Sequence, residues 1–131
     1  MGVPNAVSRF LLPQNCMAFG QISAANTNRD GTGTIVDVLV AGSEGTEIES
    51  VRVQAVATTT VGVVRLFIHN GTVWRLWKEL LVDAITPSAS VEAFSVEDVP
   101  TTRMLLPFGY KLGAATHNAE TFNVWASGGN Y

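Results

Sequence analysis

The sequence predicts an all-β protein: an antiparallel β-sandwich, a jelly roll of about eight strands, with an extended N-terminal arm. From residue 34 onward, short segments rich in β-branched residues alternate with turn residues about every ten positions, a pattern typical of a sandwich or barrel. No segment shows a sustained helical period. With 131 residues, the chain is long enough for one domain with a single hydrophobic core.

The first part of the chain has a different character. Residues 1–33 contain two prolines and the polar stretch NRDGTGT, and no strand or helix period persists through them. We therefore expect an extended arm over residues 1–33 and the sandwich domain over residues 34–131. The apolar pieces FLLP and CMAF need a surface to lie on, either their own domain or a neighbouring copy. The candidate assembly contacts of the arm are Phe10, Leu11, Leu12 and Phe19.

The expected strands follow one another along the sandwich domain. TIVDVLVAG is rich in β-branched residues, and EIESVRVQAVATTT alternates with one break near Ser50, where we expect a β-bulge. VGVVRLFI and TVWRLWKELLV flank an Asn-Gly turn; the second contains helix-favouring residues, but its position opposite a clear strand favours β-structure. VEAFSVED, RMLLPFGYKLGAAT and ETFNVWAS complete the set.

The hairpin around Asn70 and Gly71 is apolar on both faces. Asn-Gly favours a two-residue loop, which would place Phe67 opposite Trp74. Only one face can pack on the opposite sheet, so the arm, another subunit or a larger surface must cover the second. The candidate assembly contacts in the hairpin are Leu66, Ile68, Val73 and Trp77.

Composition restricts the class of partner. Charged residues make up 15% of the chain, well below the roughly 25% of an ordinary globular domain, which indicates that part of the surface is covered. The net charge of -3 and the absence of a basic stripe argue against nucleic acid. No apolar run is long enough to span a membrane, and the opening residues do not form a secretory signal. Cys16 is the sole cysteine and excludes an internal disulfide.

No motif in the sequence indicates catalysis, so we expect no enzyme, no cofactor and no metal site. His69 and His117 lack the spacing of a cupin metal site, and we expect both to be exposed at turns. The chain has no G-x-S-x-G, and GTGT lacks the ending of a phosphate-binding loop. The carboxylates, which lack calcium-loop spacing, are expected to be solvated loop charges; two clusters are Glu44, Glu47 and Glu49, and Glu92, Glu97 and Asp98.

The aromatic residues permit two interpretations. We favour the sandwich core or a subunit contact, where large aromatic area contributes most. A sugar-binding groove is the alternative, since aromatic rings stack on pyranose rings. The residues concerned are Phe67, Trp74, Trp77, Phe94, Phe108, Phe122 and Trp125.

The stretches TTTVGVVRLFIHNGTVWRLWKELLV and LPFGYKLGAATHNAETFNVWASGGNY resemble small structural proteins of tailed bacteriophages and prophages. The resemblance covers about residues 58–131 and consists of a V-R-L-F-I strand, an Asn-Gly turn, an L-P-x-G-Y-x-L segment and a final strand ending in Gly-Gly and an aromatic residue. It implies a capsid decoration or cement protein made in the host cytoplasm, often a homotrimer, whose partner is the major capsid protein or another virion protein. It implies no functional residues.

Two other functions remain open at this point. The same strand framework occurs in tail, fibre and head–tail joining proteins. A carbohydrate-binding jelly-roll module is the other alternative.

Overall fold

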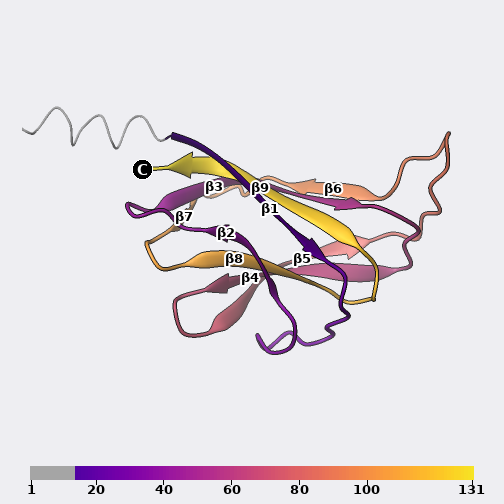
Figure 1. The fold of residues 1–131 in the computed structure, drawn as a ribbon, viewed down its shortest axis with the longest axis horizontal. Helices are drawn as coiled ribbons and strands as arrows, with labels where there is room; N and C mark the ends of the chain where they lie inside the picture. The colour runs from indigo at the N-terminus through magenta and orange to yellow at the C-terminus, as the bar shows by residue number, and fades with distance from the viewer. Residues whose placement is uncertain (1–13) are drawn as a thin grey trace, which may run out of the picture.

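The computed structural model describes residues 14–131, which form nine β-strands and no helix. Their strand pairs are all antiparallel and lie in two sheets, drawn in the upper and lower parts of Figure 1. In sheet A, the neighbours are β1 (Gln14–Ile22), β9 (Phe122–Asn130), β3 (Thr46–Ala55) and then, both on the far side of β3, β6 (Ser95–Asp98) and β7 (Met104–Leu106). In sheet B, the order is β2 (Val36–Val40), β8 (Lys111–Thr116), β4 (Gly62–His69) and β5 (Trp74–Val82). The predicted all-β class with two antiparallel sheets is confirmed.

The strand pairs are nested around the Asn70-Gly71 turn. β4 pairs with β5, β3 with β6 and β7, β2 with β8, and β1 with β9, so each pair encloses the one before it. Successive pairs lie alternately in sheet B and sheet A. The chain therefore has the connectivity of one long hairpin folded over itself, with Asn70-Gly71 near its tip.

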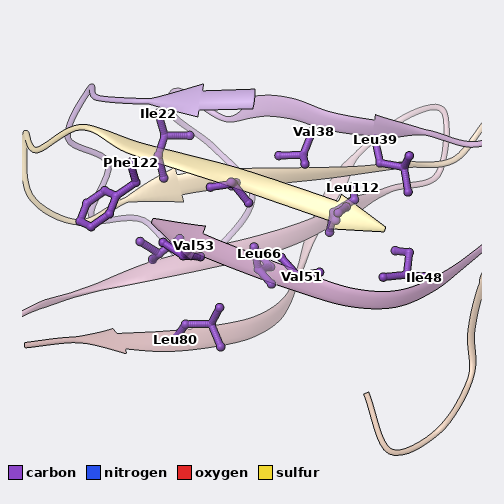
Figure 2. Packing of buried hydrophobic residues seen from close by; sticks show 14 of the residues in the cluster. Ile22, Val38, Leu39, Ile48, Val51, Val53, Leu66, Leu80, Leu112 and Phe122 are labelled. Atoms are coloured by element: carbon purple, nitrogen blue, oxygen red, sulfur yellow. The ribbon is translucent and has the colours of Figure 1, made fainter. Parts of the chain in front are cut away.

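The core lies between the two sheets, where Figure 2 shows Val51 and Val53 of sheet A with Leu66 and Leu112 of sheet B. Apolar residues alternate along β3 because one face of the strand is buried and the other is not. The alternation breaks between Ile48 and Ser50, where the register with β9 shifts. The bulge predicted near Ser50 is confirmed.

The predicted two-residue hairpin loop is wrong. The loop comprises residues 70–73, and Phe67 pairs with Leu76 instead of Trp74. The side chain of Asn70 explains the longer loop, because its Oδ1 accepts the backbone N–H groups of Thr72 and Val73, each at 3.0 Å. A register shift then leaves Trp77 without a paired residue in β4.

The structure shows which hairpin face is the core. Leu66 and Ile68 pack into the core between the sheets. Arg65 and Phe67 are on the other side of β4 and are also buried. That side is crossed by residues 23–35, here called the strap, which Figure 1 shows below sheet B. The Asn26 backbone donates its N–H to the Thr116 carbonyl of β8 at 2.8 Å. The chain itself therefore covers the second face around Arg65 and Phe67, while Leu81 on the same face stays exposed.

Two parts of the predicted arm are therefore part of the sandwich. Residues 23–33 belong to the strap, and residues 14–22 form β1, which pairs with β9 along its whole length. Ile22 of β1 is buried in the core. Residues 1–13 lie outside the described residues, and so do the predicted contacts Phe10, Leu11 and Leu12.

The segment RMLLPFGYKLGAAT forms two strands, not one. β7 ends at Leu106 and β8 begins at Lys111. Between them the Tyr110 N–H donates to the Pro107 carbonyl at 3.0 Å. Gly109 has a φ of 90°, which only glycine adopts without strain, so this turn is encoded locally.

Candidate interaction surface on sheet A

The outer face of sheet A, here called the sheet A face, carries the exposed apolar side chains of Met17 and Phe19. Its residues alternate with core residues along β1, β9, β3 and β6. Met17 and Phe19 of β1 are 70% and 66% exposed. No segment of the described chain lies over this face as the strap does over sheet B. Its residues are Met17, Phe19, Gln21, Ser50, Arg52, Gln54, Ser95, Glu97, Asn123, Trp125 and Ser127.

One row of side chains crosses the centre of the sheet A face. Phe19 is opposite Trp125, Trp125 is opposite Arg52, and Arg52 is opposite Glu97. The rings of Phe19 and Trp125 contact one another, with centroids 4.8 Å apart and planes tilted by 46°. Directly opposed side chains are the closest neighbours on a sheet, so the register places an apolar half beside a charged half.

A shallow groove runs beside this row. It is lined by Met17, Ser50, Arg52, Gln54, Glu97, Trp125 and Ser127. Arg52 donates through Nη2 to Gln54 Oε1 at 3.2 Å, and the hydroxyls of Ser50 and Ser127 are 2.7 Å apart. The groove thus offers apolar surface from Met17 and Trp125, with a guanidinium and a carboxylate nearby. This arrangement suits a peptide segment with large apolar side chains and one charge.

The described residues predicted as contacts lie in three different places. Phe19 is on the sheet A face, whereas Leu66 is fully buried in the core. Ile68 and Trp77 are partly buried against that core, and Val73 is half-buried in the hairpin loop. Met17, an apolar residue of the predicted arm, was not among the predicted contacts, although its two-residue spacing from Phe19 in MAF is the signal of one strand face.

The aromatic residues do not gather in one groove. Phe67, Phe94 and Phe122 are buried, as the core interpretation requires. Trp74 lies against Gly113, where an added Cβ would come within 2.6 Å of its ring, and Lys111 Nζ is 5.3 Å from the ring centroid. Phe108 is exposed in the turn after β7. Of these aromatic residues, only Trp125 lies on the sheet A face.

Neither histidine is part of a metal site. In the described part of the chain, no group of three His, Cys, Asp or Glu side chains is placed to hold a metal ion. Both histidines are half-buried, so their predicted full exposure is wrong. His69 Nδ1 accepts the Gly71 N–H at 3.1 Å, and His117 Nδ1 is 3.2 Å from Arg65 Nη2.

Arg65 connects the strap to sheet B through hydrogen bonds. Its side chain is 1% exposed and donates to Glu79 Oε2 at 2.9 Å and to the Asn26 carbonyl of the strap at 3.2 Å. Arg29 of the strap donates to the same Glu79 oxygen at 2.7 Å. The hydrogen bonds from Arg29 and then Arg65 lower the pKa of Glu79 below its ordinary value. The buried charge is thus compensated within the monomer.

Two carboxylates of the predicted clusters, Glu47 and Asp98, form ion pairs. Glu47 lies in β3 and accepts hydrogen bonds from Arg103 and Tyr131. These bonds, Arg103 first, lower the pKa of Glu47. Asp98 of β6 pairs with Lys78 of β5 at 2.6 Å and so links the two sheets. These carboxylates have a structural role rather than the predicted solvated one.

Comparisons with known proteins identify no relative of this chain. No protein-family model matches the chain, and neither the curated proteins nor the solved structures contain a significant match. Among residues 14–131 there is also no helix suited to crossing a membrane.

Proposed function

We propose that this protein is a structural subunit of a tailed-phage virion, a jelly-roll capsid decoration or cement protein that binds the assembled head and stabilises it. The sequence resemblance over residues 58–131 supports the virion class. The nested strand pairs support the jelly roll, because a long hairpin rolled into two sheets places successive pairs alternately in each.

The observation that carries the proposal is the unequal covering of the two sheets. The strap covers the outer face of sheet B around Phe67 and Arg65, which are buried, and leaves Leu81 at the end of β5 exposed. The sheet A face instead exposes Met17 and Phe19 beside Trp125. A contiguous apolar patch with polar neighbours marks an interaction site. We assign the contacts with other virion subunits to this face.

Stabilisation of the head then follows from mass action. A protein that binds the assembled shell and not its dissociated subunits shifts the equilibrium toward the shell in proportion to its occupancy. No catalytic group is needed for this role. The partner is the major capsid protein or another virion protein, and a homotrimer is the favoured form.

The test uses particles of the virus or prophage that encodes the chain, prepared without this protein. A variant with Met17→Ser and Phe19→Ser should stay folded and bind these particles at least tenfold more weakly. The control variant carries Val61→Ser and Leu81→Ser, which change residues 78% and 77% exposed on the other side of the sandwich. It should bind like the unmodified protein. Equal binding by both variants, or absence of the protein from purified virions by mass spectrometry, would refute the proposal.

A carbohydrate-binding module is the second candidate, and the contact between Phe19 and Trp125 favours it. The exposed ring of Phe19 and the half-buried ring of Trp125 lie beside Arg52 and Gln54, which offer donors and acceptors to hydroxyl groups. Binding to a glycan array that is lost in a Trp125→Ala variant, without binding to particles, would favour this function over the first. A tail, fibre or head–tail joining role would instead show as incorporation into tails or necks.

A further inference from the structure

We infer that the occupant of the sheet A face is the N-terminal segment of a second copy of this chain, with residues 9–12 lying in the groove. This inference rests on the proposed function in one respect, since both assign contacts to the same face. It adds that the protein self-associates before any other virion protein is present.

The chemistry of the segment matches that of the groove. Residues 9–12 are Arg-Phe-Leu-Leu, one cation followed by three large apolar side chains. The groove offers Met17 and Trp125 as apolar surface, and the exposed carboxylate of Glu97 lies on its far side. The apolar side chains would cover the aromatic half of the face while Arg9 reaches Glu97. Such pairing of charge with charge sets the register of a bound peptide.

The position of the segment favours another copy over its own domain. The segment joins β1 at Gln14, only three residues before Met17. To cover its own Met17, the chain would have to reverse direction between residues 10 and 14. Pro13 restricts the residue before it to extended conformations. Residues 9–12 contain none of Gly, Pro, Asn, Asp and Ser, the residues that favour tight reversals.

The length of the segment is sufficient for such an exchange. Thirteen residues span at most about 43–47 Å when extended. Four strands side by side are only about 15–20 Å wide. Because the donated segment and the receiving groove are different surfaces, copies that exchange segments form a reciprocal pair, a closed ring or, where the rotation does not close, an open filament.

The decisive experiment mixes two chains that each carry a single cysteine, both in a Cys16→Ala background. One chain carries Leu11→Cys, and the other, which has a size tag, carries Ser127→Cys in the groove. Mild oxidation should give a disulfide-linked heterodimer on a non-reducing gel. A tagged chain with Leu81→Cys, on the opposite sheet, is the matched control and should link at least tenfold less.

Two results would overturn the inference. One is linkage to Ser127→Cys no faster than to the control position. The other is a chain with both Leu11→Cys and Ser127→Cys that closes on itself as a monomer, since the segment would then cover its own face.

Sedimentation distinguishes this inference from the proposed function. The full chain should sediment as an oligomer, and a Leu11→Asp variant should sediment as a monomer with unchanged unfolding. A full chain that stays monomeric overturns self-association. If in that case the Met17→Ser, Phe19→Ser variant still loses particle binding, the proposed function holds without the inference. Exchange without particle binding supports the inference and refutes the proposed function.

Discussion

Glu79 accepts hydrogen bonds from Arg65 and Arg29 through one oxygen atom. Removal of the Glu79 carboxylate should affect these two arginines very differently. Arg65 Nε is 2.9 Å from Glu79 Oε2, and Arg29 Nε is 2.7 Å from it. The distances are similar, but the surroundings are not. Arg65 is 1% exposed, whereas the side chain of Arg29 is 63% exposed.

A Glu79→Ala substitution leaves the Arg65 guanidinium buried without a counter-ion. Breaking a fully buried ion pair in this way costs about 3–5 kcal/mol, and we expect roughly 2–4 kcal/mol here because a third of the Glu79 side chain is exposed and Arg65 keeps its bond to the Asn26 carbonyl. An Arg29→Ala substitution removes an exposed partner and should cost only about 0.2–1 kcal/mol. A Glu79→Gln variant retains an acceptor and should fall between them.

Urea unfolding followed by tryptophan fluorescence measures these differences. The midpoint should fall with little change in the slope, because the surface exposed on unfolding is almost unchanged. A double-mutant cycle then gives the coupling of each arginine with Glu79, and it should be larger for Arg65. Equal losses for Glu79→Ala and Arg29→Ala would refute the burial argument, as would a Glu79→Ala loss below about 1 kcal/mol.

Three further predictions follow from the same structure. The folded-state pKa of Glu79 is lowered from 4.5, so the stabilisation that Glu79 provides is complete above pH 4.5 and is lost as the pH falls through the folded-state pKa. The stability difference between the unmodified protein and Glu79→Gln, measured by urea unfolding, should therefore shrink as the pH falls below 4.5. Phe67→Ala should cost about 3–5 kcal/mol in a chain lacking residues 1–13, because the strap buries this face within one monomer; a loss under about 1 kcal/mol would mean that another subunit covers it. Deletion of residues 1–13 should leave the circular dichroism spectrum and cooperative unfolding intact, whereas deletion of residues 1–22 removes β1 and should abolish folding, so cooperative unfolding of the longer deletion would contradict the role of β1.

The strands and the bulge near Ser50 could be predicted from the sequence because they leave a local pattern. A strand with one buried face alternates apolar and polar residues, and an extra residue interrupts that alternation. In β3 the interruption coincides with the register shift after Ile48. The buried face of a strand is thus encoded within about ten residues.

The hairpin register could not be predicted in the same way. Asn-Gly is compatible with loops of two or more residues, and the choice depends on where the Asn70 side chain finds donors. Its bonds to the N–H groups of Thr72 and Val73 form the longer loop. A different loop length changes the pairing of every residue in the hairpin, so Phe67 pairs with Leu76 and not with Trp74 as predicted.

The strap and β1 could not be predicted from the sequence because their partners lie far along the chain. β1 pairs with β9, about a hundred residues later, and the polar strap has no strand or helix period. One signal was present in β4. Arg65 stands in a run of apolar residues, and a charge in such a run needs fixed partners when it is buried. Those partners are Glu79 and the strap.

The same requirement explains why one outer face is covered within the monomer and the other is not. The outer face of sheet B buries Arg65, so its counter-ion and the strap must be in place for the domain to fold. The charged groups of the sheet A face, Arg52 and Glu97, lie at the surface, where water solvates them. Its apolar residues can stay exposed in a stable monomer until a partner arrives. This division suits a subunit that folds first and assembles afterwards, as proposed here, and it predicts that substitutions at Phe19 will change association with little effect on folding.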